Sequence, residues 1–279
     1  MNPSLVDEIQ KEVLTKYNGD VDQFFNDIKQ LFLTSQSEIT QNNTLSKTKL
    51  GKPKDEIIVE VKNLSKEYKI GSEVTNALQN VNLSIKKGEM VAIMGPSGSG
   101  KSTFLNILAG LEKPTSGSTN VAGYDVARLT DNQASQFRNR VLGFIFQFFY
   151  LQPFLRIREN VEIPLFFADI PKSKRYIKSR KLLKDVGLEA KEKHLPKHLS
   201  GGQMQRIAII RALINEPQII LADEPTGNLD RKTGNEVMNL LADINRESGT
   251  TIIIVTHDEK IAEQAHRIIQ FEDGKIVTK

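Results

Sequence analysis

A glycine-rich stretch of nine residues, Gly95 to Thr103, constrains the fold of this chain more than any other segment. Its sequence, Gly-Pro-Ser-Gly-Ser-Gly-Lys-Ser-Thr, matches the pattern G-x-x-x-x-G-K-[ST] of phosphate-binding loops. An apolar run at residues 89–94 precedes it, and residues 102–109 follow with apolar positions at helical spacing. The chain therefore predicts a strand, a glycine loop and a helix in direct succession. A flexible Gly/Ser linker would not have these flanks.

The residue types in this loop suit a triphosphate. Glycines let successive backbone N–H groups point at an anion, and the positive end of the following helix points to the same place. Lys101 is expected to reach the β- and γ-phosphates, and Ser102 is expected to hold Mg²⁺ through its hydroxyl. The candidate nucleotide-binding residues of the loop are Gly95, Pro96, Ser97, Gly98, Ser99, Gly100, Lys101, Ser102 and Thr103.

Composition excludes several classes of protein. Of the 279 residues, 26% are charged and 39% are hydrophobic, which is the profile of a globular protein. No stretch approaches 18 consecutive apolar residues, so no transmembrane helix is expected. Acidic residues near the N-terminus argue against a secretory signal. The absence of cysteine excludes disulfides and thiolate chemistry, and it is compatible with a reducing cytosol.

The positive charge of the chain is concentrated in one segment. Residues 171–197 contain ten Lys or Arg against three acidic residues, a local charge of +7, whereas the whole chain carries +4. A solvated helical face explains such a segment, and attraction to an anionic membrane surface or an acidic partner is the functional alternative. Nucleic acid is the least favoured partner, because no interleaved aromatic residues or recognition-helix pattern accompany the charge.

The N-terminal residues differ from the rest of the chain. Residues 1–34 are expected to form a short helical hairpin, because apolar residues recur at helical spacing on both sides of Asn18-Gly19-Asp20. Two short helices bury little surface alone, so the hairpin is expected to pack on the main domain, on a second copy or on a different protein. Residues 35–55 are polar and typical of a flexible linker. The main domain is expected at residues 56–279.

Within the main domain, two runs are apolar throughout, Ile219–Ala222 and Thr251–Val255. Strands that are apolar on both faces imply a parallel sheet covered by helices, and hence an α/β fold. Shorter runs at 57–61, 81–85 and 143–146 are expected to add strands.

Helical character predominates from about residue 148 to residue 215. There Ser173 is expected to cap a helix that ends at Gly187. The side chains of this helix that are expected to face inward are Tyr176, Ile177, Leu182, Leu183 and Val186.

Polar residues follow three of the predicted strands. Asp223 and Glu224 come after one apolar run, His257 after another, and Gln147 after a third. The carboxyl ends of parallel strands meet at one edge, where ligands of open α/β sheets gather. Asp223 is expected to support Mg²⁺ and Glu224 to activate water. A histidine at a strand end and a loop amide also have ordinary structural explanations, as capping or packing groups.

A second candidate anion-binding element starts at Ser200. This serine precedes Gly201 and Gly202 at a predicted helix start, where a hydroxyl and free N–H groups meet the positive end of a helix. An ordinary glycine turn with a serine cap is the structural alternative.

The combination and order of these motifs closely resembles the nucleotide-binding subunit of ATP-binding cassette (ABC) transporters over residues 56–279. The stretches Glu224–Asp230 and Phe146–Pro153 are most similar to the lipoprotein-release and macrolide-export branch, to which the cell-division ABC ATPase is close. The resemblance implies a P-loop ABC ATPase core with a parallel sheet, an N-terminal antiparallel subsheet and a helical signature subdomain, preceded here by a short α-helical extension.

The resemblance also implies roles for individual residues. Tyr68 would stack on adenine, and Asp230 would lie in the loop that passes between subunits. Gln147 would sense the γ-phosphate and face the membrane subunit, while His257 would steady the γ-phosphate. The implied catalytic residues are Glu224 as the base, His257, Gln147 and Lys101. The implied metal-binding residues are Ser102, Gln147 and Asp223. The implied signature residues, which contact ATP bound to the other subunit, are Ser200, Gly201, Gly202 and Gln203.

A loop and a signature that face different nucleotides imply a homodimer closed by two ATP molecules with Mg²⁺. The implied protein is a cytoplasmic ATPase, peripheral on the inner face of the cell membrane through its permease, with no nucleic-acid partner. The end of the sequence soon after Asp273-Gly274-Lys275 leaves no room for a C-terminal regulatory domain, which weighs against the sugar-importer type. The first 55 residues have no counterpart in the typical subunit and are expected to be a docking or regulatory addition.

A non-transport ATPase that regulates a membrane partner, as in cell division, shares every one of these residues and stays open. ABC ATPases of translation carry two cassettes, and those of DNA repair carry long coiled coils with sustained heptads, which this sequence lacks.

Overall fold

The structure is a computed structural model that describes residues 15–16, 20–23, 26–27, 57–71 and 73–277. These residues divide into two compact units. The smaller unit comprises residues 150–214 with the described part of the N-terminal segment, and the larger unit comprises the remainder. The linker expected at 35–55 and most of the hairpin expected at 1–34 lie outside the described residues. Residues 15–16, 21–23 and 26–27 are helical.

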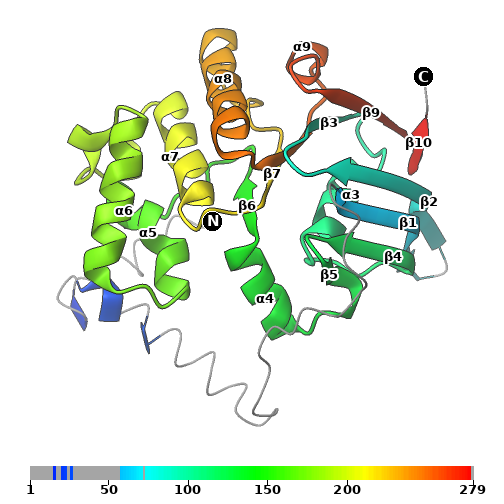
Figure 1. Ribbon diagram of the computed structural model, residues 1–279, viewed down its shortest axis with the longest axis horizontal. Helices are drawn as coiled ribbons and strands as arrows, with labels where there is room; N and C mark the ends of the chain where they lie inside the picture. Colours follow the sequence, from blue (N-terminus) through cyan, green and yellow to red (C-terminus); the bar gives the residue numbers. More distant parts are fainter. Residues whose placement is uncertain (1–14, 17–19, 24–25, 28–56, 72, 278–279) are drawn as a thin grey trace. The chain divides into compact units, whose positions relative to one another are not determined.

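The larger unit is built on a six-stranded sheet with the order β10-β9-β3-β8-β7-β6 (Figure 1). Its strands are parallel except for β10, which is antiparallel to β9. This confirms the predicted α/β fold, because the central strands are apolar on both faces and buried on both. The strands are β3 (Met90–Met94), β6 (Leu142–Ile145), β7 (Ile219–Asp223), β8 (Thr251–Val255), β9 (Arg267–Glu272) and β10 (Lys275–Val277).

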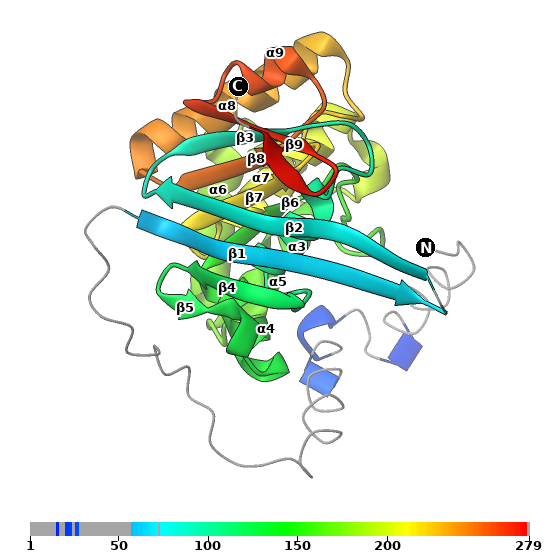
Figure 2. The same cartoon turned by 90° about the vertical axis from the view of Figure 1, so that its right-hand side faces the viewer.

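A second sheet of four antiparallel strands, in the order β2-β1-β4-β5, confirms the predicted antiparallel subsheet (Figure 2). Its strands are β1 (Ile57–Ile70), β2 (Glu73–Lys86), β4 (Ser116–Val121) and β5 (Tyr124–Asp125). The strands expected at 57–61 and 81–85 are therefore only parts of two 14-residue strands. Register shifts along the β1–β2 pairing interrupt the alternation of buried and exposed residues, which hid their length.

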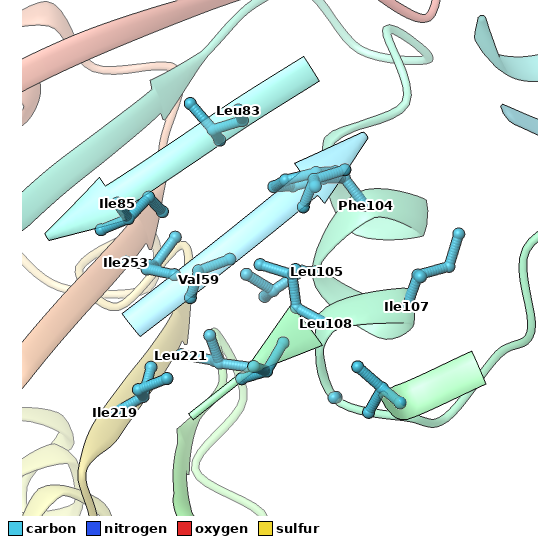
Figure 3. Close-up of a cluster of buried hydrophobic side chains, with 14 of the residues drawn as sticks. Val59, Leu83, Ile85, Phe104, Leu105, Ile107, Leu108, Ile219, Leu221 and Ile253 are labelled. Atoms are coloured by element: carbon cyan, nitrogen blue, oxygen red, sulfur yellow. The ribbon is translucent and has the colours of Figure 1, made fainter. Parts of the chain in front are cut away.

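One hydrophobic cluster joins the two sheets of the larger unit (Figure 3). Val59 of β1 and Ile85 of β2 face α3 from one side, and Leu221 and Ile253 belong to the central strands. Phe104 of α3 is fully buried, and its ring centroid lies 5.3 Å from that of Phe271. The helices of this unit are α3 (Lys101–Leu108), the 3-10 helix η1 (Val126–Arg128), α4 (Asp131–Arg140), α8 (Arg231–Ser248) and α9 (Glu259–Ala262).

The smaller unit is helical, and in it α5 packs against both α6 and α7 (Figure 1). Its helices are α5 (Ile157–Phe167), α6 (Lys172–Asp185), the 3-10 helices η2 (Glu189–Lys191) and η3 (Pro196–His198), and α7 (Gly201–Leu213).

Two expectations for α6 are wrong. Pro171, not Ser173, precedes the first residue of the helix, and no side chain caps it. Tyr176 and Ile177 are exposed rather than inward, whereas Leu183 is fully buried. The ring of Tyr176 instead lies 5.1 Å and 5.9 Å from the guanidinium carbons of Arg158 and Arg180, within the range of cation–π contacts.

Candidate active site

The phosphate loop connects β3 to α3, as predicted. The backbones of β9 and β2 lie in close contact with two of its glycines. Gly95 has φ +152°, and a Cβ on it would lie 2.1 Å from the carbonyl oxygen of Phe271 in β9. Gly100, with φ +97°, is the N-cap of α3, and a Cβ there would lie 2.3 Å from the carbonyl oxygen of Ala77 in β2. Only glycine satisfies both the left-handed backbone and these contacts.

Lys101, the first residue of α3, folds back over this loop. Its ammonium donates hydrogen bonds to the carbonyl oxygens of Gly95 at 2.8 Å and Pro96 at 2.7 Å. Burial lowers the pKa of Lys101, and the negative charges of Glu224 and Asp223 partly oppose that shift. The ammonium therefore lies within the field of both strand-end carboxylates.

The sheet register brings the predicted strand-end residues to one edge. Val255 at the end of β8 pairs with Ile93 of β3 on one side and with Asp223 of β7 on the other. Burial raises the pKa of Asp223, the charge of Glu224 raises it further, and Lys101 lowers it. Two carboxylates and one ammonium thus share an edge beside the phosphate loop, which is an arrangement suited to a metal-bound phosphate.

Glu224 and His257 form a direct pair at this edge. Nδ1 of His257 lies 2.7 Å from Oε1 of Glu224, and the glutamate side chain is 18% exposed against 73% for the histidine. The backbone of Glu224 is left-handed, with φ +47°. Two hydrogen bonds hold this conformation: its N–H donates to Val255 and its carbonyl accepts from Gly227. A strained residue held by its surroundings is a feature of functional sites.

Gln147 lies two residues beyond β6 and contacts Gly227 and Asn228, for which the sequence predicted no role. The side-chain amide of Asn228 donates a 2.8 Å hydrogen bond to the backbone carbonyl of Gln147. A Cβ on Gly227 would lie 3.0 Å from Nε2 of Gln147. Gly227 and Asn228 therefore position Gln147, and the only signal for them in the sequence was their place between Glu224 and Asp230.

Tyr68 and Asp230 also belong to the larger unit. Tyr68, on β1, donates a hydrogen bond from its hydroxyl to Glu112 and interacts with Thr103 of α3. Burial raises the pKa of Tyr68, and the hydrogen bond with Glu112 raises it further. Asp230 is the N-cap of α8 and accepts hydrogen bonds from the N–H groups of Lys232 and Thr233. Tyr68 is thus brought to the phosphate-loop helix, and Asp230 begins the helix after the Glu224 loop.

The residues expected to form the signature belong to the smaller unit, at the start of α7. Ser200 is the N-cap, and its hydroxyl accepts a hydrogen bond from the N–H of Gln203, whose side chain accepts one from the N–H of Ser200. The serine is exposed, and Gly201 and Gly202 form the first turn. The hydroxyl and the glycine N–H groups thus meet at a helix N-terminus, as the sequence predicted.

The contacts of the phosphate loop are tested by a matched pair of substitutions. Gly98 has φ +80° with no atom within 4 Å of a built Cβ, so Gly98→Ala should cost only its backbone strain, about 1 kcal/mol. Gly95→Ala meets the Phe271 carbonyl as well, and should cost about 3 kcal/mol or more. Chemical denaturation measures both, and equal losses of stability would contradict the close packing of the loop on β9.

Comparisons with known proteins agree with this geometry. Residues 78–227, more than half of the chain, match the family described as ABC transporter. The chain is 46% identical to the ABC transporter ATP-binding protein YknY of Bacillus subtilis, over 79% of its own length and 95% of the relative. It is 47% identical to the macrolide export ATP-binding/permease protein MacB of Shigella flexneri, of which it spans 34%.

Among solved structures, the dimeric post-hydrolysis state of the ATP-binding cassette MJ0796 bound to ADP and Pi is similar to this chain. The TM-score is 0.73 at 47% identity, and the match covers 79% of this chain and 97% of the other. The chain therefore belongs to the ABC transporter family and is one of its ATP-binding, ATP-hydrolysing cassettes.

Proposed function

We propose that this cassette powers a separate membrane permease of the export or lipoprotein-release type. The observation that carries the catalytic part of the proposal is the convergence of Lys101, Asp223 and the Glu224–His257 pair beside the phosphate loop. The name of MacB joins an ATP-binding part to a permease part, and this chain is similar to about a third of that protein. This supports a permease as the partner. No helix among the described residues has the length and apolarity to cross a bilayer.

The side chains present fit a nucleotide with Mg²⁺. The carboxylate of Asp223, the hydroxyl of Ser102 and the amide of Gln147 are oxygen donors of the kind that Mg²⁺ accepts alongside phosphate oxygens. When bound, the ion would supply charge neutralisation at the phosphates. Lys101 would bind the β- and γ-phosphates, Glu224 would accept the proton of the attacking water, and His257 would orient Glu224 and steady the γ-phosphate. Tyr68 would stack on adenine.

The working unit in this proposal is a homodimer. The phosphate loop and the signature at Ser200 occur once each in the chain and lie on different compact units. The related MJ0796 cassette has been solved as a dimer with ADP and Pi. We infer that Ser200, Gly201, Gly202 and Gln203 complete the site of a second copy, that Asp230 lies between the copies, and that ATP closes the pair before hydrolysis reopens it.

Replacement of Glu224 tests the base and the dimer together. Glu224→Gln keeps the size of the side chain but cannot accept a proton, so ATP turnover should fall by about 10²- to 10⁴-fold while ATP binding persists. The variant should then accumulate as a dimer in size-exclusion chromatography with ATP and Mg²⁺. The exposed Glu247→Gln near the end of α8 is the matched control. A Glu224→Gln chain that binds ATP and stays monomeric would contradict the two-copy site.

The positioning of Gln147 is tested at Asn228. Asn228→Ala removes the hydrogen bond to the Gln147 carbonyl, whose contribution of about 0.5–1.5 kcal/mol corresponds to a roughly 2- to 10-fold loss of turnover. ATP affinity measured by calorimetry should not change, because the phosphate loop is untouched. Asn235→Ala on the exposed face of α8 is the control. Wild-type turnover in Asn228→Ala would show that the contact does not position Gln147.

Isolation from the native membrane tests the partner. We expect the protein to reside in the cytoplasm at the inner face of the membrane and to co-purify with a many-span permease that has a large extracytoplasmic domain. Recovery of a division-site membrane protein instead would favour a regulator that signals through ATP-driven dimerisation. Recovery of no membrane protein would contradict both.

A further inference from the structure

The first turn of α6 in the smaller unit concentrates positive charge where a helix is already positive. Lys172, Lys174 and Arg175 occupy this turn, which contains no acidic residue and has no side-chain cap. Over its whole length α6 carries seven basic residues against one acid. Because the N-terminal end of a helix attracts anions and repels cations, a carboxylate supplied from another element would stabilise this turn.

Arg175 is the buried cation in this turn that requires a carboxylate partner. Its side chain is 8% exposed, donates to the carbonyl oxygen of Ile170 at 2.9 Å and lies over the ring of Phe166. Oε2 of Glu162 in α5 is 3.9 Å from its Nε atom, beyond hydrogen-bond distance, while Oε1 of the same carboxylate accepts hydrogen bonds from Arg158 at 2.6 Å and from Ser179 at 2.7 Å. The guanidinium is therefore a buried cation that α5 and α6 neutralise only in part.

Asp22 of the N-terminal segment supplies the carboxylate. One of its oxygens accepts a hydrogen bond from the Arg175 guanidinium, and the other lies 2.8 Å from Nζ of Lys172. Asp20 fixes the position of Asp22, because its carboxylate accepts hydrogen bonds from the N–H groups of Asp22 and Gln23. Asp20, Val21 and Asp22 line a pocket of about 230 Å³ together with residues of α5 and the start of α6.

The N-terminal segment and α6 carry opposite net charges, beyond the contacts of Asp22. Residues 1–34 contain six acidic and three basic side chains, a net charge of −3, whereas α6 carries +6. We propose that the start of α6 is a carboxylate-binding docking site whose occupant is the N-terminal segment of the same chain, bound through Asp22. This interaction surface is independent of the proposed transport function, since none of its residues belongs to the nucleotide site.

The absence of cysteine from the sequence allows two nitroxide labels to be placed without background. Gln23→Cys and Lys181→Cys are both at exposed positions within the smaller unit, and pulsed electron spin resonance of the full-length, doubly labelled chain reports the distances between them. The docked segment should give one narrow distribution. Asp22→Asn should raise the population at longer, broader distances on the order of tenfold or more. Salt at 1 M, where the Debye length is about 3 Å, should act in the same direction.

Three controls make the result specific. Asp27→Asn removes an equal charge outside the pocket and should leave the distribution narrow. Lys172→Glu should also release the segment, because it replaces one of the two cations that bind Asp22 with an anion, and Lys172 is largely exposed and tolerates reversal. A mixture of the two singly labelled chains should show no short distance. An unchanged distribution in Asp22→Asn, equal release in Asp27→Asn, a docked segment in Lys172→Glu, or a short distance in the mixture would overturn the proposal.

Discussion

The phosphate loop is packed against backbone from both sheets of the larger unit, and the positions of the loop and the two sheets therefore depend on one another. The N–H of Gly274 donates to the Ser99 carbonyl, and the Gly274 carbonyl accepts from the N–H of Gln79 in β2. The turn between β9 and β10 therefore bridges the loop and the antiparallel sheet. Since Gly95 meets Phe271 of β9 and Gly100 meets Ala77 of β2, the loop cannot shift without moving both sheets, and its N–H groups keep their directions.

The phosphate loop lies beside three charged side chains, Lys101, Asp223 and Glu224, that interact with one another. Lys101 and Asp223 are each partly shielded from water, and this burial lowers the pKa of Lys101 and raises the pKa of Asp223. The attraction between Lys101 and the two carboxylates opposes the pKa shifts that burial causes. The repulsion between Asp223 and Glu224 adds to the upward shift of the Asp223 pKa. A site with this balance would gain from a phosphate and a divalent cation together, because the anion would pair with the ammonium and the cation with the carboxylates. The sheet edge is thus preorganised for a charged ligand.

The parts of the fold that the sequence predicted are those whose signal is local. The continuous apolar runs of β7 and β8 follow from burial on both faces, and the phosphate loop follows from its glycines. The strand β9 was missed, because its exposed Arg267 and Ile268 interrupt the apolar run of a strand that pairs with both β3 and β10. The role of Asn228 is tertiary: its partner is a backbone carbonyl 81 residues away, and no spacing rule contains that information. The inward assignment of Tyr176 failed for a similar reason, since arginines from α5 and α6 cover its ring.

The smaller unit shows why a contact at the start of α6 matters to α7. One turn of α7 is buried at four consecutive positions, Ile207, Ala208, Ile209 and Ile210, so packing partners surround the helix there. The helix α5 is one of those partners and packs equally against α6. Arg158 and Glu162 of α5 belong to the same charge network as Arg175 and Ser179 of α6. An N-terminal segment bound to that network through Asp22 therefore adds its ion pairs to the helix pair that supports α7, which begins at Ser200, Gly201 and Gly202.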